Sequence, residues 1–203
     1  AFRVDSSTVS NLFYVRNDGA VSSLNGYWIG SEKIFYINPN GTTDNLFVGQ
    51  NSGNLTMTGV QNTALGSDVL SALTTGQGNT GFGKQSVLSN QSGSYNTAIG
   101  LQSLTILSTG DYNTAIGYRA LYNTNNSQNT AIGAFCLGGS AGVNNIGIGY
   151  DAMSSIAAAA NNIGIGVSVL SAASFSGGFN VAIGNNAAKT VTTGSENVII
   201  GYS

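Results

Sequence analysis

A five-residue motif recurs ten times along the chain and sets the length of its repeat. The motif is Asn, any residue, a small or apolar residue, a large apolar residue and Gly, as in Asn113-Thr114-Ala115-Ile116-Gly117. Consecutive copies begin 16, 17 or 18 residues apart, at Asn45, Asn62, Asn79, Asn96, Asn113, Asn129, Asn145, Asn162, Asn180 and Asn197. A repeat this short cannot hold a pair of helices but suits one coil of a β-solenoid. The sequence therefore predicts an all-β fold, a β-solenoid of about ten 17-residue coils.

The first and last motif residues are typical of corners in such a coil. Gly adopts positive φ without a Cβ clash, and Asn tolerates the left-handed region and can bond its amide to Asn in neighbouring coils. We therefore predict a structural corner ladder rather than a catalytic site. Its members are Asn62, Asn79, Asn96, Asn113, Asn129, Asn145, Asn162, Asn180, Asn197, Gly66, Gly83, Gly100, Gly117, Gly133, Gly149, Gly166, Gly184 and Gly201.

A second apolar position keeps step with the motif, four residues after the Gly in most repeats. It is occupied by Leu70, Val87, Leu104, Leu121, Leu137, Met153, Leu170 and Ala188. A turn-rich stretch such as Thr74 to Gly78 then leads to the next Asn. Each repeat is thus expected to form a strand, a Gly corner, a short strand and a loop.

Both faces of the motif strand are apolar, which predicts association of identical chains. The third position is small, as in Ala98 and Gly147, while positions two and four become Ile or Val throughout the last four coils. One face can fill the coil, and the other needs a cover that no expected helix supplies. We expect a parallel homo-oligomer, with a homotrimer as the preferred state. The sequence leaves open which face is internal.

Composition excludes several classes of function. Charged residues make up 7% of the chain, the net charge is −2 and no basic cluster exists, so neither nucleic acid nor an anionic membrane surface is an expected partner. No segment approaches the ~20 apolar residues of a spanning helix, so we expect no membrane insertion. His is absent and Cys136 is the only cysteine, which argues against a His/Cys metal site and an intrachain disulfide. Segment 76–81 matches the glycines of a dinucleotide-binding loop, but the repeat already explains each Gly, so we expect no cofactor. Cys136 stands where other repeats carry Ala or Val, so we expect it to be buried.

The acidic residues do not form the pairs that a glycosidase uses, and we expect no enzymatic activity. Asp68 and Asp151 share a register but lie five coils apart, about 24 Å, whereas hydrolysis needs ~5–10 Å. Asp111 and Glu196 also lie five coils apart. A capsule depolymerase is therefore the disfavoured alternative. An ice-binding solenoid is a further alternative, but its flat Thr array would be broken where Thr at position two gives way to Ile and Val after Thr130.

Residues 1–44 follow different rules from the repeat array at 45–203. They contain turn signals such as Asn17-Asp18-Gly19 between strand-like runs, which predicts a small N-terminal β-hairpin or meander cap. Tyr27 and Trp28 are the candidate ligand contacts, because their rings could stack on a sugar of a receptor glycan. Packing of both rings inside a trimer core is the preferred expectation, and ligand contact is the alternative.

The repeat resembles those of known fibrous proteins. The Asn-Thr-Ala-Ile-Gly units followed by Tyr118-Arg119-Ala120-Leu121 resemble repeats of bacteriophage tail-fibre proteins, and they are similar to the β-roll repeats in trimeric autotransporter adhesin heads. This resemblance, over residues 45–203, implies a trimeric extracellular fibre segment used for host attachment and as a rigid spacer. A bacterial surface adhesin or appendage subunit is the alternative.

The resemblance also implies a location on a virion tail fibre or a bacterial cell surface, and a cell-surface glycan or protein as receptor. The loop positions vary in sequence while the strands stay uniform. We therefore expect any lateral binding to use loop tips such as 122–128 or 171–179.

Overall fold

The computed structural model describes residues 44–54, 56–172 and 174–202, together with the backbone of four short strands before them. These four strands are β1 (Phe13–Val15), β2 (Val21–Ser23), β3 (Tyr27–Ile29) and β4 (Glu32–Ile37). In the described residues the fold is all-β and contains no helix. Accordingly, that part of the chain offers no apolar helix of the length that crosses a bilayer.

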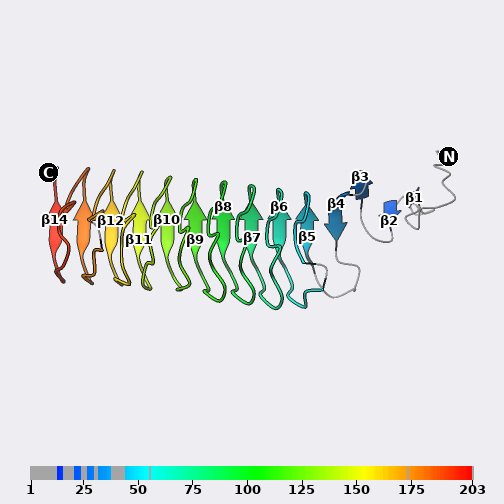
Figure 1. Cartoon of the computed structure of the whole chain (residues 1–203), viewed down its shortest axis with the longest axis horizontal. Helices are drawn as coiled ribbons and strands as arrows, with labels where there is room; N and C mark the ends of the chain where they lie inside the picture. The colour runs from blue at the N-terminus through cyan, green and yellow to red at the C-terminus, as the bar shows by residue number, and fades with distance from the viewer. Residues whose placement is uncertain are drawn as a thin grey trace.

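Ten parallel three-residue strands build the solenoid, one for each motif. They are β5 (Leu46–Val48), β6 (Thr63–Leu65), β7 (Thr80–Phe82), β8 (Thr97–Ile99), β9 (Thr114–Ile116), β10 (Thr130–Ile132), β11 (Ile146–Ile148), β12 (Ile163–Ile165), β13 (Val181–Ile183) and β14 (Val198–Ile200). Each strand pairs in register with the strand one coil away, so that Ala98 lies beside Ala115. The result is a β-solenoid of about nine turns whose strands all point the same way along one side (Figure 1). The predicted all-β solenoid is confirmed.

The sheet continues beyond the first coil by antiparallel pairing. Strand β4 pairs with β5 and strand β3 pairs with β4, while β1 and β2 form a separate two-stranded pair. The expected N-terminal cap otherwise lies outside the described residues.

Two walls fill the interior of each coil. One is the strand, which contributes its middle residue, and the other is the segment after the Gly corner. The middle strand residue is buried and its two neighbours face outward, as for Ala115 in β9. The opposite wall supplies larger apolar side chains, which fit because the strand side is small. A Cβ added to Gly147, for example, would lie 2.6 Å from Cys136 Sγ. The small third motif position is therefore internal, and positions two and four form the outer surface.

The segment after each Gly corner is a turn, not the short strand expected from the sequence. Residues two and four positions after the Gly are left-handed in every described coil, as for Arg119 with φ 54° and Leu121 with φ 49°. This alternation buries two adjacent side chains, such as Ala120 and Leu121, on the same side. A strand would point them to opposite faces. Backbone hydrogen bonds link neighbouring coils here, as from the Leu104 N–H to the Ala120 carbonyl at 2.9 Å, but the described return segments form isolated bridges, such as Ile106 with Asn123, instead of strands.

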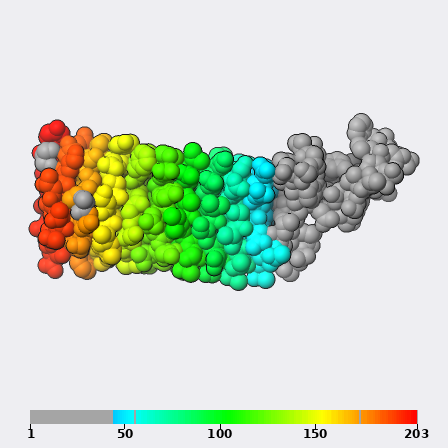
Figure 2. Space-filling model, in the orientation of Figure 1, coloured from blue at the N-terminus to red at the C-terminus, as the bar shows by residue number. Residues whose placement is uncertain are grey.

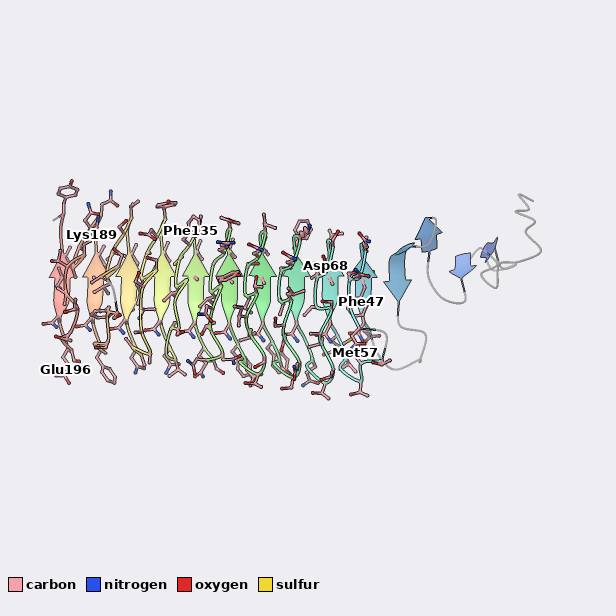
Figure 3. All side chains as sticks on the ribbon, viewed as in Figure 1. Phe47, Met57, Asp68, Phe135, Lys189 and Glu196 are labelled. Carbon is pink, nitrogen blue, oxygen red and sulfur yellow. The ribbon has the colours of Figure 1, made fainter. Side chains whose placement is uncertain are left out.

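The coils stack into a straight rod over the described residues. In the space-filling view, each coil forms a band across the long axis, and neighbouring bands are in contact along their whole width (Figure 2). Each coil has one edge where its strand ends, the glycine corner, and one where its strand begins, the asparagine corner. Phe135 and Lys189 project from the first edge, and Glu196 from the opposite one (Figure 3).

Candidate functional site

The outward side of the ten strands, here called the strand face, carries two unbroken columns of side chains. Motif position two contributes Leu46, Thr63, Thr80, Thr97, Thr114, Thr130, Ile146, Ile163, Val181 and Val198. Motif position four contributes Val48, Leu65, Phe82, Ile99, Ile116, Ile132, Ile148, Ile165, Ile183 and Ile200. Because the pairing is in register, like side chains lie one above another along the rod.

The strand face is open to solvent in the single chain, with an apolar position-four column beside a position-two column that is Thr in β6 to β10 and aliphatic in the other coils. From β6 to β13, exposure in the position-four column ranges from 36% at Ile148 and Ile165 to 52% at Phe82, and it reaches 73% at Ile200 in the last coil. No charged residue occupies either column. All-parallel sheets are normally covered on both faces, and contiguous exposed apolar surface marks an interaction site. This face is consequently the main candidate site for assembly.

The apolar surface extends around the glycine corner in the middle coils. The residue after the Gly is exposed and apolar or aromatic at Leu101, Tyr118, Tyr150 and Val167. The rings of Tyr118 and Phe135 meet edge to face with centroids 5.1 Å apart, and those of Phe135 and Tyr150 at 6.0 Å. The motif analysis did not single out this row, because its members occupy two different positions of the repeat.

The asparagine corner is held together by a continuous ladder of buried amides. In each coil the Asn Oδ1 accepts a hydrogen bond from the backbone N–H of the Asn one coil later, as between Asn96 and Asn113 at 2.9 Å. The Asn113 Nδ2 donates to Asn96 Oδ1 at 3.0 Å and to the Asn126 carbonyl at 2.9 Å. The backbone link recurs from Asn45 to Asn197. The ladder satisfies polar backbone groups that the turn would otherwise bury without a partner.

The left-handed backbone at this corner is not on the asparagines, contrary to the expectation from the sequence. The residue before each Asn takes that conformation instead, as in Gln61 with φ 60°, Tyr95 with φ 59° and Glu196 with φ 62°. The ladder asparagines are not among the residues with positive φ.

The glycine corner relies on backbone conformation and close contact between coils. The motif glycines have φ between 114° at Gly83 and 144° at Gly201. A Cβ on Gly117 would lie 2.6 Å from the carbonyl oxygen of Gly133, a backbone atom that cannot move aside. The structure thus places the asparagines and glycines singled out from the sequence in two separate columns at opposite edges of the coil.

The ionisable residues singled out from the sequence belong to different coils of the described array. Cys136 is buried, and desolvation raises the pKa of its thiol to about 12. Asp68 and Asp151 belong to the coils of β6 and β11, and each accepts a local hydrogen bond, from Asn51 and Ser168 respectively. Within the described ranges, no three His, Cys, Asp or Glu residues gather where they could hold a metal ion.

The remaining sequence candidates divide between the described and undescribed parts. Tyr27 and Trp28 belong to β3, whose side chains lie outside the described residues. In the loop candidate 122–128, the Tyr122 ring contacts the guanidinium of Arg119, with Cζ 5.0 Å from the ring centroid. No repeat spacing in the sequence marks Arg119 as a functional residue. Searches against protein-family models, curated proteins and solved structures found no match to this chain.

Proposed function

We propose that this chain is a structural and adhesive segment of an extracellular fibre, in which identical parallel chains cover one another's strand faces. The observation that carries the proposal is the uncharged, in-register outer surface of the ten strands, which is apolar along the whole position-four column and in both columns from β11 to β14. A copy running in the same direction offers the same column at the same spacing, about 4.8 Å per coil, so contacts repeat without loss of register along the rod.

The number of chains and the biological setting follow from the resemblance of the repeat. Phage tail-fibre and adhesin-head repeats favour a homotrimer, and three flat faces can close around one axis parallel to the rod. We propose a phage tail fibre that attaches to a host and acts as a rigid spacer, without catalytic activity. The in-register hydrogen bonding of every coil to the next supports the spacer role, because it gives the rod no hinge within the described array.

A matched pair of variants tests the location of the interface. Ile148→Asp places a carboxylate on the strand face, and Ile106→Asp places one at a similarly exposed Ile on the return segment; the wild-type side chains are 36% and 43% exposed. A buried unpaired charge at an interface is strongly unfavourable, so we expect Ile148→Asp to weaken self-association by at least about tenfold. Ile106→Asp should self-associate like the wild type in sedimentation velocity.

Equal association by both variants would contradict the proposed interface. A loss of association by Ile106→Asp alone would place the interface on the return side of the coil instead. Circular dichroism of both variants ensures that a change in mass is not a consequence of unfolding.

A further inference from the structure

One cationic side chain on the glycine-corner edge is held in a fixed position by its neighbours. The Arg119 Nε donates to Gln102 Oε1 at 2.9 Å, and Gln102 is in turn bonded to Gln85 at 3.0 Å. The Arg119 Cζ lies 5.3 Å from the Tyr118 ring centroid and 5.0 Å from that of Tyr122. The guanidinium is thus positioned by two aromatic rings and one hydrogen bond.

The terminal nitrogens of this guanidinium remain available for a ligand. Among the described residues, Arg119 forms no ion pair, and its Nη atoms make no hydrogen bond to the protein. The next acid in the same column, Asp151, lies two coils away, about 10 Å by strand spacing. A guanidinium that is oriented but unneutralised suits two-point recognition of a planar anion, because its N–H fork matches a carboxylate.

The surface beside Arg119 adds a second recognition element. The exposed rings of Tyr118 and Tyr150, with Phe135 between them, form a short aromatic row along the same edge. Such rings contact the apolar faces of sugars while their hydroxyls remain solvated. From this juxtaposition we infer that the Arg119 edge binds an acidic polysaccharide, with Arg119 on a sugar carboxylate and the aromatic row on the adjoining sugar.

The inference rests on the proposed attachment function and gives its receptor a chemical class. It places the binding surface at the glycine-corner edge, from which Phe135 projects, and away from the strand face that the sister chains would cover (Figure 3). Each chain carries one such site, so an oligomer presents several sites at one level, which raises the affinity for a polymeric ligand.

Titration calorimetry of the full chain with hexagalacturonate tests the inference, with the fully methyl-esterified hexamer as the neutral probe. We expect at least about tenfold weaker binding of the ester, and the same loss for Arg119→Gln with hexagalacturonate, because a charge-assisted bidentate contact is lost. Lys84→Gln, which removes a cation two coils away, should change the dissociation constant by less than about twofold. Tyr122→Ala should weaken binding by an intermediate factor.

Equal binding of acid and ester, equal losses for Arg119→Gln and Lys84→Gln, or binding only to sulfated oligosaccharides would each overturn the inference. So would an absence of hexagalacturonate binding by the wild type. An oligomeric protein that binds no acidic sugar would leave the proposed fibre assembly standing. A monomer that binds through Arg119 would instead refute the assembly and retain the site.

Discussion

The two corners of each coil solve the same problem, reversing the chain next to an identical neighbour, by different physical means. At the asparagine corner a side chain substitutes for missing backbone partners, and Asn113 alone connects three other residues of the ladder and loop. At the glycine corner the absence of a side chain is the requirement, because Gly117 touches the backbone of Gly133. One corner is therefore sensitive to the loss of atoms and the other to their addition.

The largest effect is expected from Gly117→Ala. The new Cβ would meet the Gly133 carbonyl at 2.6 Å, and the φ of 134° is strained for any L-residue. We expect a loss of at least about 4 kcal/mol in the free energy of unfolding. Guanidinium denaturation followed by circular dichroism would measure it at fixed protein concentration.

Gly178→Ala is the matched control for the glycine corner. Its added Cβ would meet only the Ala160 carbonyl, at 3.1 Å instead of 2.6 Å, and Gly178 does not have the positive φ of Gly117, so its effect should be smaller than that of Gly117→Ala. Similar losses for the two glycines would show that the tight backbone contact at the corner is not what requires Gly.

Asn113→Ala is expected to have the second largest effect. It leaves the backbone N–H of Asn129 and the carbonyl of Asn126 without these partners. Orphaned polar groups of this kind destabilise a protein by about 1–3 kcal/mol each, so we expect a loss of about 3 kcal/mol. Asn113→Asp should not rescue stability, because it keeps the acceptor but buries a charge and lacks the donor.

Asn123→Ala is the control for the asparagine corner, because the Asn123 side chain is exposed and takes no part in the ladder. Thermal unfolding measures the stability of both variants. If Asn123→Ala proves as destabilising as Asn113→Ala, the amide ladder contributes nothing particular to the fold.

A smaller effect should follow from Gly147→Ala, a glycine between the corners with ordinary φ. Its added Cβ would lie 2.6 Å from Cys136 Sγ and 3.1 Å from Leu137 Cγ. Overpacking of a core typically destabilises by about 1–3 kcal/mol, and we expect about 2 kcal/mol here. The double variant with Cys136→Ala should recover part of this loss, because Ala120 and Ala152 occupy the same column in adjacent coils.

A double-mutant cycle for Gly147 and Cys136 measures that coupling directly. Strictly additive losses would mean that side-chain crowding does not explain Gly at this position. Recovery of stability in the double variant would show that Gly147 is required because a neighbouring side chain fills the space beside it. Gly117, by contrast, is required because backbone atoms fill the space beside it.

The repeat pattern predicted the solenoid because every coil repeats the same strand and corner residues at nearly constant spacing. It could not predict which strand face is internal, since Ala98 on one face and Ile99 on the other are both apolar. The interior became clear only when the return segment placed Leu104 inside the coil with Ala98. That return segment was mispredicted, because left-handed backbone falls on residues such as Gln102 and Val87, whose side chains give no signal for it.

Arg119 was missed for a related reason. Its partners Gln102, Tyr118 and Tyr122 come from two coils and three repeat positions, so no spacing in the sequence joins them. The asparagine and glycine columns, by contrast, each occupy one repeat position and are visible in the sequence alone. Features that repeat with the coil were predictable, and features that interrupt it required the structure.

The solution mass of residues 1–203, from size-exclusion chromatography with light scattering, tests the central claim most directly. Association through the strand face predicts a mass three times the 20.6 kDa of one chain. A soluble protein of 20.6 kDa over a wide concentration range would contradict it, because the apolar position-four column of all ten strands would then be stable in water without a cover.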